Sequence, residues 1–97
     1  MIIIAGTVDV HAEDLNAFLA AVKKVSESSR QEKGCLAYQF AHAVEDRNRL
    51  SLFEVWADKA AFDSHLQAPH FLAYREATGK LRQTRNIGRY DGSELKA

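Results

Sequence analysis

The spacing of the hydrophobic residues changes several times along this chain, and few folds are compatible with the order of these changes. Residues 2–10 are rich in β-branched side chains and begin with the consecutive run Ile2-Ile3-Ile4, which is typical of a buried strand. From about Glu13 the apolar side chains recur every three or four positions and predict an amphipathic helix: Leu15, Phe18, Leu19, Val22 and Val25. We expect this helix to fade through residues 26–33 and to end by Gly34, since glycine tolerates the left-handed geometry common beyond a helix end.

The second half of the chain predicts two more strands, an interrupted helix and a last strand. Residues 35–42 and 49–56 have strand composition, and the polar residues 45–48 suit a hairpin connection between them. Asp58 can cap a helix over about 59–67, while Pro69 disfavours helical geometry at Ala68 and suits the start of a second helix over 69–78. Residues 81–90 complete the order strand, helix, strand, strand, helix, strand. This is the split βαβ order of a ferredoxin-like α+β domain with an antiparallel sheet.

Both faces of the predicted sheet carry hydrophobic side chains. The helices of such a fold cover one face, yet the consecutive apolar residues at Ile2-Ile3-Ile4 and from Leu50 to Val55 reach the other face too. Large exposed apolar patches usually mark interfaces, and closed two-fold dimers are the commonest assemblies. We therefore expect a homodimer packed sheet to sheet.

The length of the chain indicates how many domains it forms, and its charge indicates which classes of partner it can bind. Ninety-seven residues suffice for one domain, which we place over residues 1–97 with a core of about 2–90 and a polar tail of 91–97. The 13 basic and 13 acidic side chains cancel, so no nucleic acid and no membrane partner is expected. A single cysteine, Cys35, and the lack of a basic leader at the start fit a cytoplasmic location.

The most distinctive segment runs from Phe53 to His65 and is followed by Pro69-His70-Phe71. A strand ending in Glu-x-Trp, a helix with Ala-x-Phe-x-x-His and a His-Phe pair opening the next helix resemble the antibiotic biosynthesis monooxygenase family. The run Gly34-Cys35-Leu36-Ala37-Tyr38 is similar to the family's second strand, so the resemblance spans about residues 2–90. It implies a dimeric α+β barrel in a family of quinol monooxygenases, polyketide-tailoring monooxygenases, an isomerase of a phosphorylated signalling sugar, and haem-degrading enzymes.

The resemblance also implies a reaction. Several members of the family oxidise phenols or quinols without metal or flavin, because the substrate anion itself passes an electron to oxygen. The chain is therefore expected to be a cofactor-independent monooxygenase acting on a quinol-like or polycyclic phenol. Two alternatives stay open, namely a cofactor-free isomerase of a small metabolite and a non-catalytic module that binds a small aromatic ligand.

The candidate catalytic residue is His65, and the candidate substrate-binding residues, most of them in or near the distinctive segment, are Trp56, Phe62, Phe71, Arg75 and Gly6. His65 is the candidate base, because imidazole titrates near neutrality and Phe62 shares its helix face; the alternative is a hydrogen-bonded structural histidine. Trp56 is a candidate wall for an aromatic ring, or else part of the core or of the dimer interface. Arg75, four residues after Phe71, can bind a phenolate through its guanidinium, or else lie in solvent.

Two strand positions also bear on this site. Gly6, on the helix-facing side of the first strand, leaves room for a ligand or else marks a bulge or a tight packing contact. Glu54 shares a strand face with Trp56, and a buried carboxylate there is expected to pair with an arginine or a lysine.

No metal or other cofactor is expected. His65 and His70 straddle the predicted helix break, with neither a ligand four residues away nor a cysteine cluster nearby. Compared with the haem-degrading branch, Gly6 replaces an asparagine, His65 a tryptophan and Arg75 the axial histidine, so haem degradation is not expected. Cys35 lacks an activating neighbour and is expected to be a buried, inert thiol.

Overall fold

The computed structural model describes residues 1–96, which form four strands, three α-helices and one 3-10 helix. In chain order the elements are β1 (Ile2–Val10), η1 (Ala12–Asp14), α1 (Leu15–Ser29), β2 (Cys35–Ala43), β3 (Asp46–Trp56), α2 (Lys59–Leu66), α3 (Pro69–Gly79) and β4 (Gln83–Asp91). Every predicted element is present. Of the predicted polar tail, Ala97 lies outside the described residues. Among residues 1–96, none of the helices has the length and hydrophobicity needed to cross a membrane.

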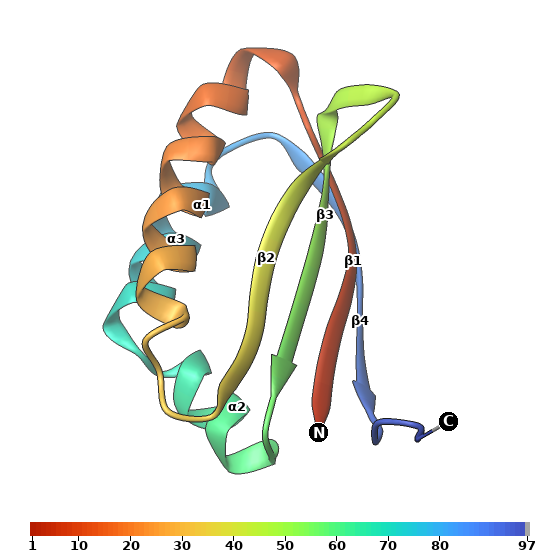
Figure 1. The fold of residues 1–97 in the computed structure, drawn as a ribbon. Coiled ribbons are helices and arrows are strands. Elements are labelled where there is room, and N and C mark those ends of the chain that lie inside the picture. Colours follow the sequence, from red (N-terminus) through yellow and green to blue (C-terminus); the bar gives the residue numbers. More distant parts are fainter. Residues whose placement is uncertain (97) are drawn as a thin grey trace.

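The strands form one antiparallel sheet in the order β2-β3-β1-β4. All three α-helices lie on the same side of this sheet, with α1 and α3 side by side and α2 at the end where β1 begins (Figure 1). The two strands that flank a helix are not neighbours in the sheet. β3 lies between β1 and β2, and β1 lies between β3 and β4, as in other split βαβ folds. This arrangement confirms the ferredoxin-like α+β fold.

Alternate side chains of the two central strands form the floor of the core. Because side chains alternate between faces along a strand, every second residue of β1 and β3 points toward the helices. The buried hydrophobic residues on these strands are Ile4, Val8, Val10, Leu50, Leu52 and Trp56. Helix α1 packs on this floor with Phe18, Val22 and Val25, which lie on one side of the helix at its natural spacing.

The β2–β3 hairpin is tighter than predicted. β3 begins at Asp46, so three of the four polar residues expected in the connection, 46–48, belong to the strand. The pairing of β1 with β3 reaches only Arg49, opposite Asp9, so the hairpin continues beyond the rest of the sheet. The polarity of residues 46–48 therefore reflects a strand end that meets solvent on both faces, not a loop.

Pro69 separates α2 from α3 as predicted. Oδ1 of Asp58 accepts a 2.8 Å hydrogen bond from the Ala61 backbone N–H and caps α2. Ala68 is extended, with φ −68° and ψ 141°, because the ring of a following proline disfavours the helical conformation. The break turns the chain so that the rings of His65, in the last turn of α2, and His70, in the first turn of α3, lie 6.0 Å apart between centroids.

Gly6 lies where β4 approaches β1 too closely for a side chain. A Cβ at this position would be 2.1 Å from the carbonyl oxygen of Asn86 and 2.6 Å from the Cα of Ile87. Both are backbone atoms of a paired strand and move only with that strand. We predict that Gly6→Ala lowers the free energy of unfolding by about 1–3 kcal/mol, the range for overpacked sites, as measured by urea denaturation.

Gly79→Ala is the matched control for this variant. Apart from its chain neighbours and the backbone of its own helix, no atom of residues 1–96 lies within 4 Å of a Cβ built on Gly79, the last residue of α3. Because alanine restricts the unfolded chain more than glycine, this change should leave stability unaltered or raise it by up to about 1 kcal/mol. Equal losses in the two variants would contradict the packing argument for Gly6.

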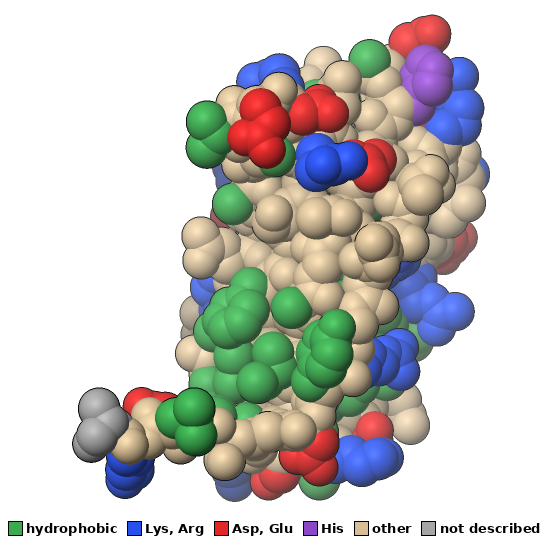
Figure 2. Space-filling model, turned by 90° about the vertical axis from the view of Figure 1, so that its right-hand side faces the viewer, with side chains coloured by type: hydrophobic (Ala, Val, Ile, Leu, Met, Phe, Trp, Pro, Cys, Tyr) green, Lys and Arg blue, Asp and Glu red, His purple; other side chains and the backbone are tan. Residues whose placement is uncertain are grey.

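The sheet face opposite the helices has an apolar half and a polar half. The register places Ile3 opposite both Val55 and Tyr90, and Ala5 opposite Phe53. We call these five residues the sheet patch. Figure 2 shows hydrophobic side chains gathered on one half of this face and charged ones on the other half, where Arg49 pairs with Asp9 at 2.7 Å.

Candidate functional site

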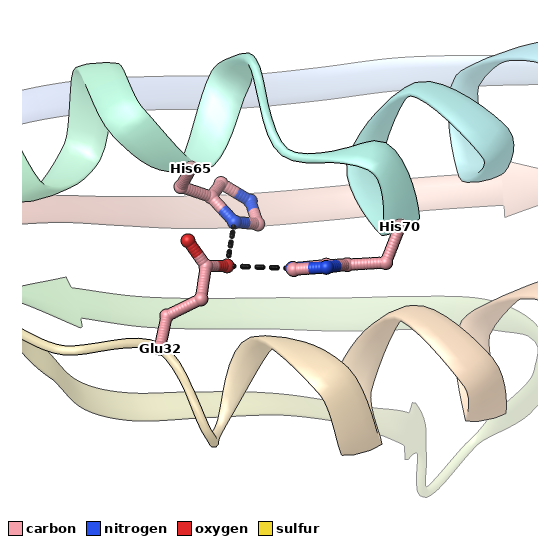
Figure 3. Close-up of side chains that lie close together, drawn as sticks. All are labelled: Glu32, His65 and His70. Atoms are coloured by element: carbon pink, nitrogen blue, oxygen red, sulfur yellow. Dashed lines mark hydrogen bonds and ion pairs between the residues drawn. The ribbon is translucent and has the colours of Figure 1, made fainter.

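Glu32, His65 and His70 meet on the inner side of the helices, as Figure 3 shows. Glu32 belongs to the connection between α1 and β2, while the two histidines flank the break between α2 and α3. Oε2 of Glu32 lies 2.6 Å from Nδ1 of His65 and 2.7 Å from Nε2 of His70. One carboxylate oxygen therefore holds both imidazole rings.

The hydrogen bond to Glu32 decides which nitrogen of His65 carries the proton. An ionised carboxylate only accepts hydrogen bonds, so Nδ1 of His65 donates to it. Burial lowers the pKa of His65, and the hydrogen bond to Glu32 opposes this effect without cancelling it. A neutral imidazole with its proton on Nδ1 carries a free lone pair on Nε2. His65 is thus oriented as a base whose available nitrogen is Nε2.

This nitrogen has no hydrogen-bond partner among residues 1–96, although it is fully buried. The His65 side chain is only 1% exposed. Oε1 of Glu54 lies 3.9 Å from Nε2, beyond hydrogen-bonding distance. Because an unpaired buried polar atom is unfavourable, a ligand group that donates a hydrogen bond to Nε2 would be stabilised there.

Glu54 is buried on the helix-facing side of β3, where its Oε1 accepts a 2.9 Å hydrogen bond from Nε1 of Trp56. The predicted pairing of Glu54 with an arginine or lysine is wrong: no such ion pair is formed within the part of the chain that the structure describes. Trp56 supplies the donor instead, because residues two apart share a strand face. Burial raises the pKa of Glu54 to about 7, against the hydrogen bond from Trp56, which lowers it. At neutral pH the site therefore combines a neutral imidazole with a partly protonated carboxyl group.

A cavity of about 60 Å³ adjoins His65 between the helices and the sheet. Its charged lining comes from Glu54, Arg85 and Arg89, and its apolar lining comes mainly from Ile4, Leu52, Phe62, Phe71 and Ile87. This space admits dioxygen or a few water molecules and is well below the ~300 Å³ of a small ligand pocket. A larger ligand would have to displace side chains of the lining.

The structure brings together four of the six predicted site residues. His65, Phe62 and Phe71 line the cavity, and Trp56 packs behind His65 with 4.5 Å between ring centroids. Arg75 is exposed on α3 and borders a different hollow, beside Thr78 and Gly79.

Gly6 is not among the residues that line the cavity. The close approach of β4 to β1 accounts for a glycine at this position. Its proposed role in leaving room for a ligand stays a prediction. Cys35 is half-buried, and burial raises the pKa of its thiol, as an inert thiol requires.

Sequence reasoning missed Glu32 as a partner of the histidines and missed the arginines of β4. Arg85, Ile87 and Arg89 alternate along β4 and pair with Val8, Gly6 and Ile4 of β1, so all three face the helices. That alternation is visible in the sequence and indicates the shared face. Glu32 sits in a polar connection that carries no such signal.

The helix break between His65 and His70, which argued from the sequence against a metal site, does not keep the two rings apart; that no metal is bound stays a prediction. Oε2 of Glu32 and one nitrogen of each histidine all lie within 4.8 Å of one another. The helix break that separates the two histidines in sequence folds them toward the same carboxylate.

Comparison with known proteins places this chain in a family. The family model described as antibiotic biosynthesis monooxygenase matches residues 1–77. The chain belongs to the antibiotic biosynthesis monooxygenase family. The match includes Glu32, both histidines and Glu54, whereas Arg85 and Arg89 lie beyond it.

Relatives of this family member include proteins from several bacteria. An uncharacterised Synechocystis protein is 35% identical over 80 residues, which are 82% of this chain and 54% of that protein. This chain therefore spans about half the length of that relative. YcnE of Bacillus subtilis, a candidate monooxygenase by its name, is 28% identical over 76% of this chain and 78% of its own.

Solved structures of similar proteins share the whole fold. A candidate antibiotic biosynthesis monooxygenase from Deinococcus radiodurans superposes with a TM-score of 0.89 and 26% identity, covering 100% of this chain and 97% of the other. Rv0793 of Mycobacterium tuberculosis superposes with a TM-score of 0.87 and 22% identity, covering 99% and 98%. At that identity the second likeness concerns the fold alone.

Proposed function

We propose that this family member is a cofactor-independent monooxygenase that oxidises a quinol-like or polycyclic phenol, with Nε2 of His65 as the base. The observation that carries the proposal is the buried, unpartnered Nε2 beside a cavity, with Nδ1 held by Glu32 at 2.6 Å. A base with one ring nitrogen oriented by a carboxylate and the other free is the arrangement that general base catalysis requires.

The chemistry needs no reductant besides the substrate. His65 takes the phenolic proton, the phenolate passes one electron to dioxygen, and the two radicals combine at a ring carbon that bears hydrogen. The peroxide anion regains a proton from the imidazolium. Loss of the ring C–H proton and cleavage of the O–O bond then give a quinone and water. The phenol thus gains one oxygen atom and loses two hydrogen atoms, and the second oxygen atom leaves in the water.

Residues around His65 can stabilise the charged groups, an imidazolium and a phenolate, that form during this reaction. Glu32 would stabilise the imidazolium through its hydrogen bond to Nδ1. We assign the binding of the phenolate to Arg85 and Arg89 in preference to Arg75, because the first two line the cavity. The guanidinium of Arg89 also lies 5.3 Å from the ring centroid of Phe62, a cation–π contact that positions it at the cavity wall.

Substrate binding should open the site, since the cavity is too small for a ring system. Phe62 and Phe71 are its aromatic lining, and the rings of Phe71 and His65 are 4.8 Å apart. A planar substrate would take the place of this tilted ring contact by displacing Phe71. The single thiol of Cys35 suits a reducing cytoplasm as the place where this reaction occurs.

We further propose that the protein is a homodimer in which the sheet patch of one copy packs on that of another. Phe53, on the central strand β3, and Tyr90, on the edge strand β4, are 47% and 57% exposed, so two large aromatic side chains of one sheet face meet solvent. A two-fold axis brings the same patch of both copies together, and this closes the assembly without leaving a free apolar surface.

Oxygen uptake tests the proposed reaction. The protein would be mixed with a panel of naphthols, hydroxyanthrones and hydroquinones in an oxygen electrode, with quinone formation followed by absorbance. One oxygen consumed per quinone, without release of hydrogen peroxide, supports a monooxygenase. Conversion without oxygen uptake supports the isomerase alternative, and a ligand that binds and is returned unchanged supports a binding module; either result overturns the proposal.

A further inference from the structure

We propose that Glu32, His65 and His70 form a binding site for a divalent zinc-type ion, and that the bound ion switches His65 off as a base. The binding part of this inference stands on geometry alone. The inhibition part rests on the proposed function.

The three side chains already supply a suitable donor set. Two imidazole nitrogens and one carboxylate oxygen converge within 4.8 Å, with the oxygen 2.6 and 2.7 Å from the two nitrogens. Zinc takes such ligands at about 2.0–2.2 Å in a tetrahedron, which leaves a fourth position for water. To admit the ion, the oxygen would move away from each nitrogen by less than about 1 Å, and the two nitrogens, now within 4.8 Å of each other, would settle roughly 3.4 Å apart. His65 and His70 lie in the helix turns on either side of the break and Glu32 lies in a connection, so this adjustment involves helix ends and a connection and not the middle of a helix.

The unpartnered nitrogen of His65 is the independent observation that points to a metal. A metal-bound imidazole carries its proton on the ring nitrogen away from the ion and usually donates it to a carboxylate. Here the far nitrogen is the buried Nε2, and Oε1 of Glu54 lies 3.9 Å from it. Glu54 is itself held by Trp56 at 2.9 Å. An ion on Nδ1 would therefore put a proton on Nε2, and Oε1 of Glu54 would become its acceptor once the two atoms approach to hydrogen-bonding distance.

The site is accessible from one side. The His70 side chain is 25% exposed and that of Glu32 15%, whereas His65 is closed off. His70 also borders a groove of about 440 Å³ between α1 and α3, whose lining includes Lys24 and Tyr74. An ion could enter along this groove, and its fourth ligand would face it. Two imidazole nitrogens and one carboxylate oxygen favour a four-coordinate zinc-type ion over an octahedral one that prefers oxygen ligands.

Metal binding would change the tautomer of His65. Without the ion, Nδ1 donates a proton to Glu32 and Nε2 has the lone pair. With the ion on Nδ1, the ring keeps one proton, now on Nε2, and no lone pair remains to accept the substrate's proton. His70 changes in the same sense, with its proton moved from Nε2 to Nδ1. The ion and the catalytic base thus compete for the same imidazole.

The test uses untagged, chelator-treated protein. Zn²⁺ is titrated calorimetrically and Co²⁺ by its visible absorption, which is intense for a tetrahedral ion. We expect one ion per chain, and a loss of affinity of at least 10-fold in His70→Ala and in Glu32→Gln, which keeps a hydrogen-bond acceptor for the imidazoles. His42→Ala is the matched control, because His42 is exposed and bonds only the backbone of Arg47. Its affinity should not change.

An absence of binding, or equal affinity in wild type and in both site variants, would overturn the inference. Thermal melts of each variant separate lost folding from lost ligands. If a phenol substrate is found, zinc should lower turnover of the wild type and should do so at concentrations at least 10-fold higher in His70→Ala. The metal titration does not depend on any substrate, so failure of the proposed function would leave it intact.

Discussion

Replacing His65 with alanine should lower turnover of a phenol substrate by roughly 10²–10⁴-fold, the usual contribution of a general base. The variant removes a buried imidazole that lines the cavity and whose Nε2 has no hydrogen-bond partner among residues 1–96. KM should change less than kcat, because the proton is transferred during the chemical step and the cavity walls remain. Steady-state oxygen uptake at saturating phenol measures the effect.

His65→Gln supports this test by filling most of the volume that alanine leaves empty. Glutamine can still donate to Glu32 yet is not a base, so it should be as inactive as alanine while folding better. If either variant keeps its rate and loses only thermal stability, His65 is structural and the proposed mechanism is wrong. His42→Ala should retain full activity, since His42 lies exposed near the end of β2.

The second large effect is expected at the sheet patch. Phe53→Asp should raise the dissociation constant of the homodimer by roughly 10²-fold or more, because two carboxylates would be buried without partners at a two-fold interface. Light scattering and sedimentation over a range of concentrations measure the shift from dimer to monomer. A wild-type protein that is monomeric at micromolar concentration would refute the dimer directly.

Leu72→Asp is the matched control for this variant. Leu72 is 48% exposed and Phe53 47%, so both changes put a carboxylate at an equally exposed apolar position. Leu72 lies on α3, on the other side of the sheet from the patch. If Leu72→Asp dissociates the dimer as strongly as Phe53→Asp, the interface is elsewhere.

The order of the elements was predictable because it depends on local spacing. The three- and four-residue spacing of Leu15, Phe18 and Val22 predicts α1, and Pro69 predicts the break between α2 and α3. The shared face of Phe62 and His65 also follows from helix geometry. For this reason the inward position of His65 could be predicted before the fold was known.

The hairpin shows where composition misleads. Residues 46–48 are polar because the first residues of β3 extend beyond β1 into solvent. A polar strand end has the same composition as a loop, so the sequence does not distinguish the two. Gly6 is a second example. A glycine in a strand indicates that another segment of the protein comes close to the backbone there, but it does not show which segment. Only the register of β1 with β4 identifies the carbonyl of Asn86 as the atom that excludes a side chain.

The sequence by itself determined the fold, the helix break and the inward face that carries His65, because each depends on residues within a few positions of one another. Only the tertiary structure decided the chemistry of that histidine. Glu32 is 33 residues before His65, and a polar connection gives no sign of where its carboxylate will point. The hydrogen bond that Glu32 accepts from His65, the lack of a partner for Nε2 among residues 1–96 and the placement of the β4 arginines all arise from packing between distant segments. They decide whether the imidazole acts as a base, as a metal ligand or as part of the core.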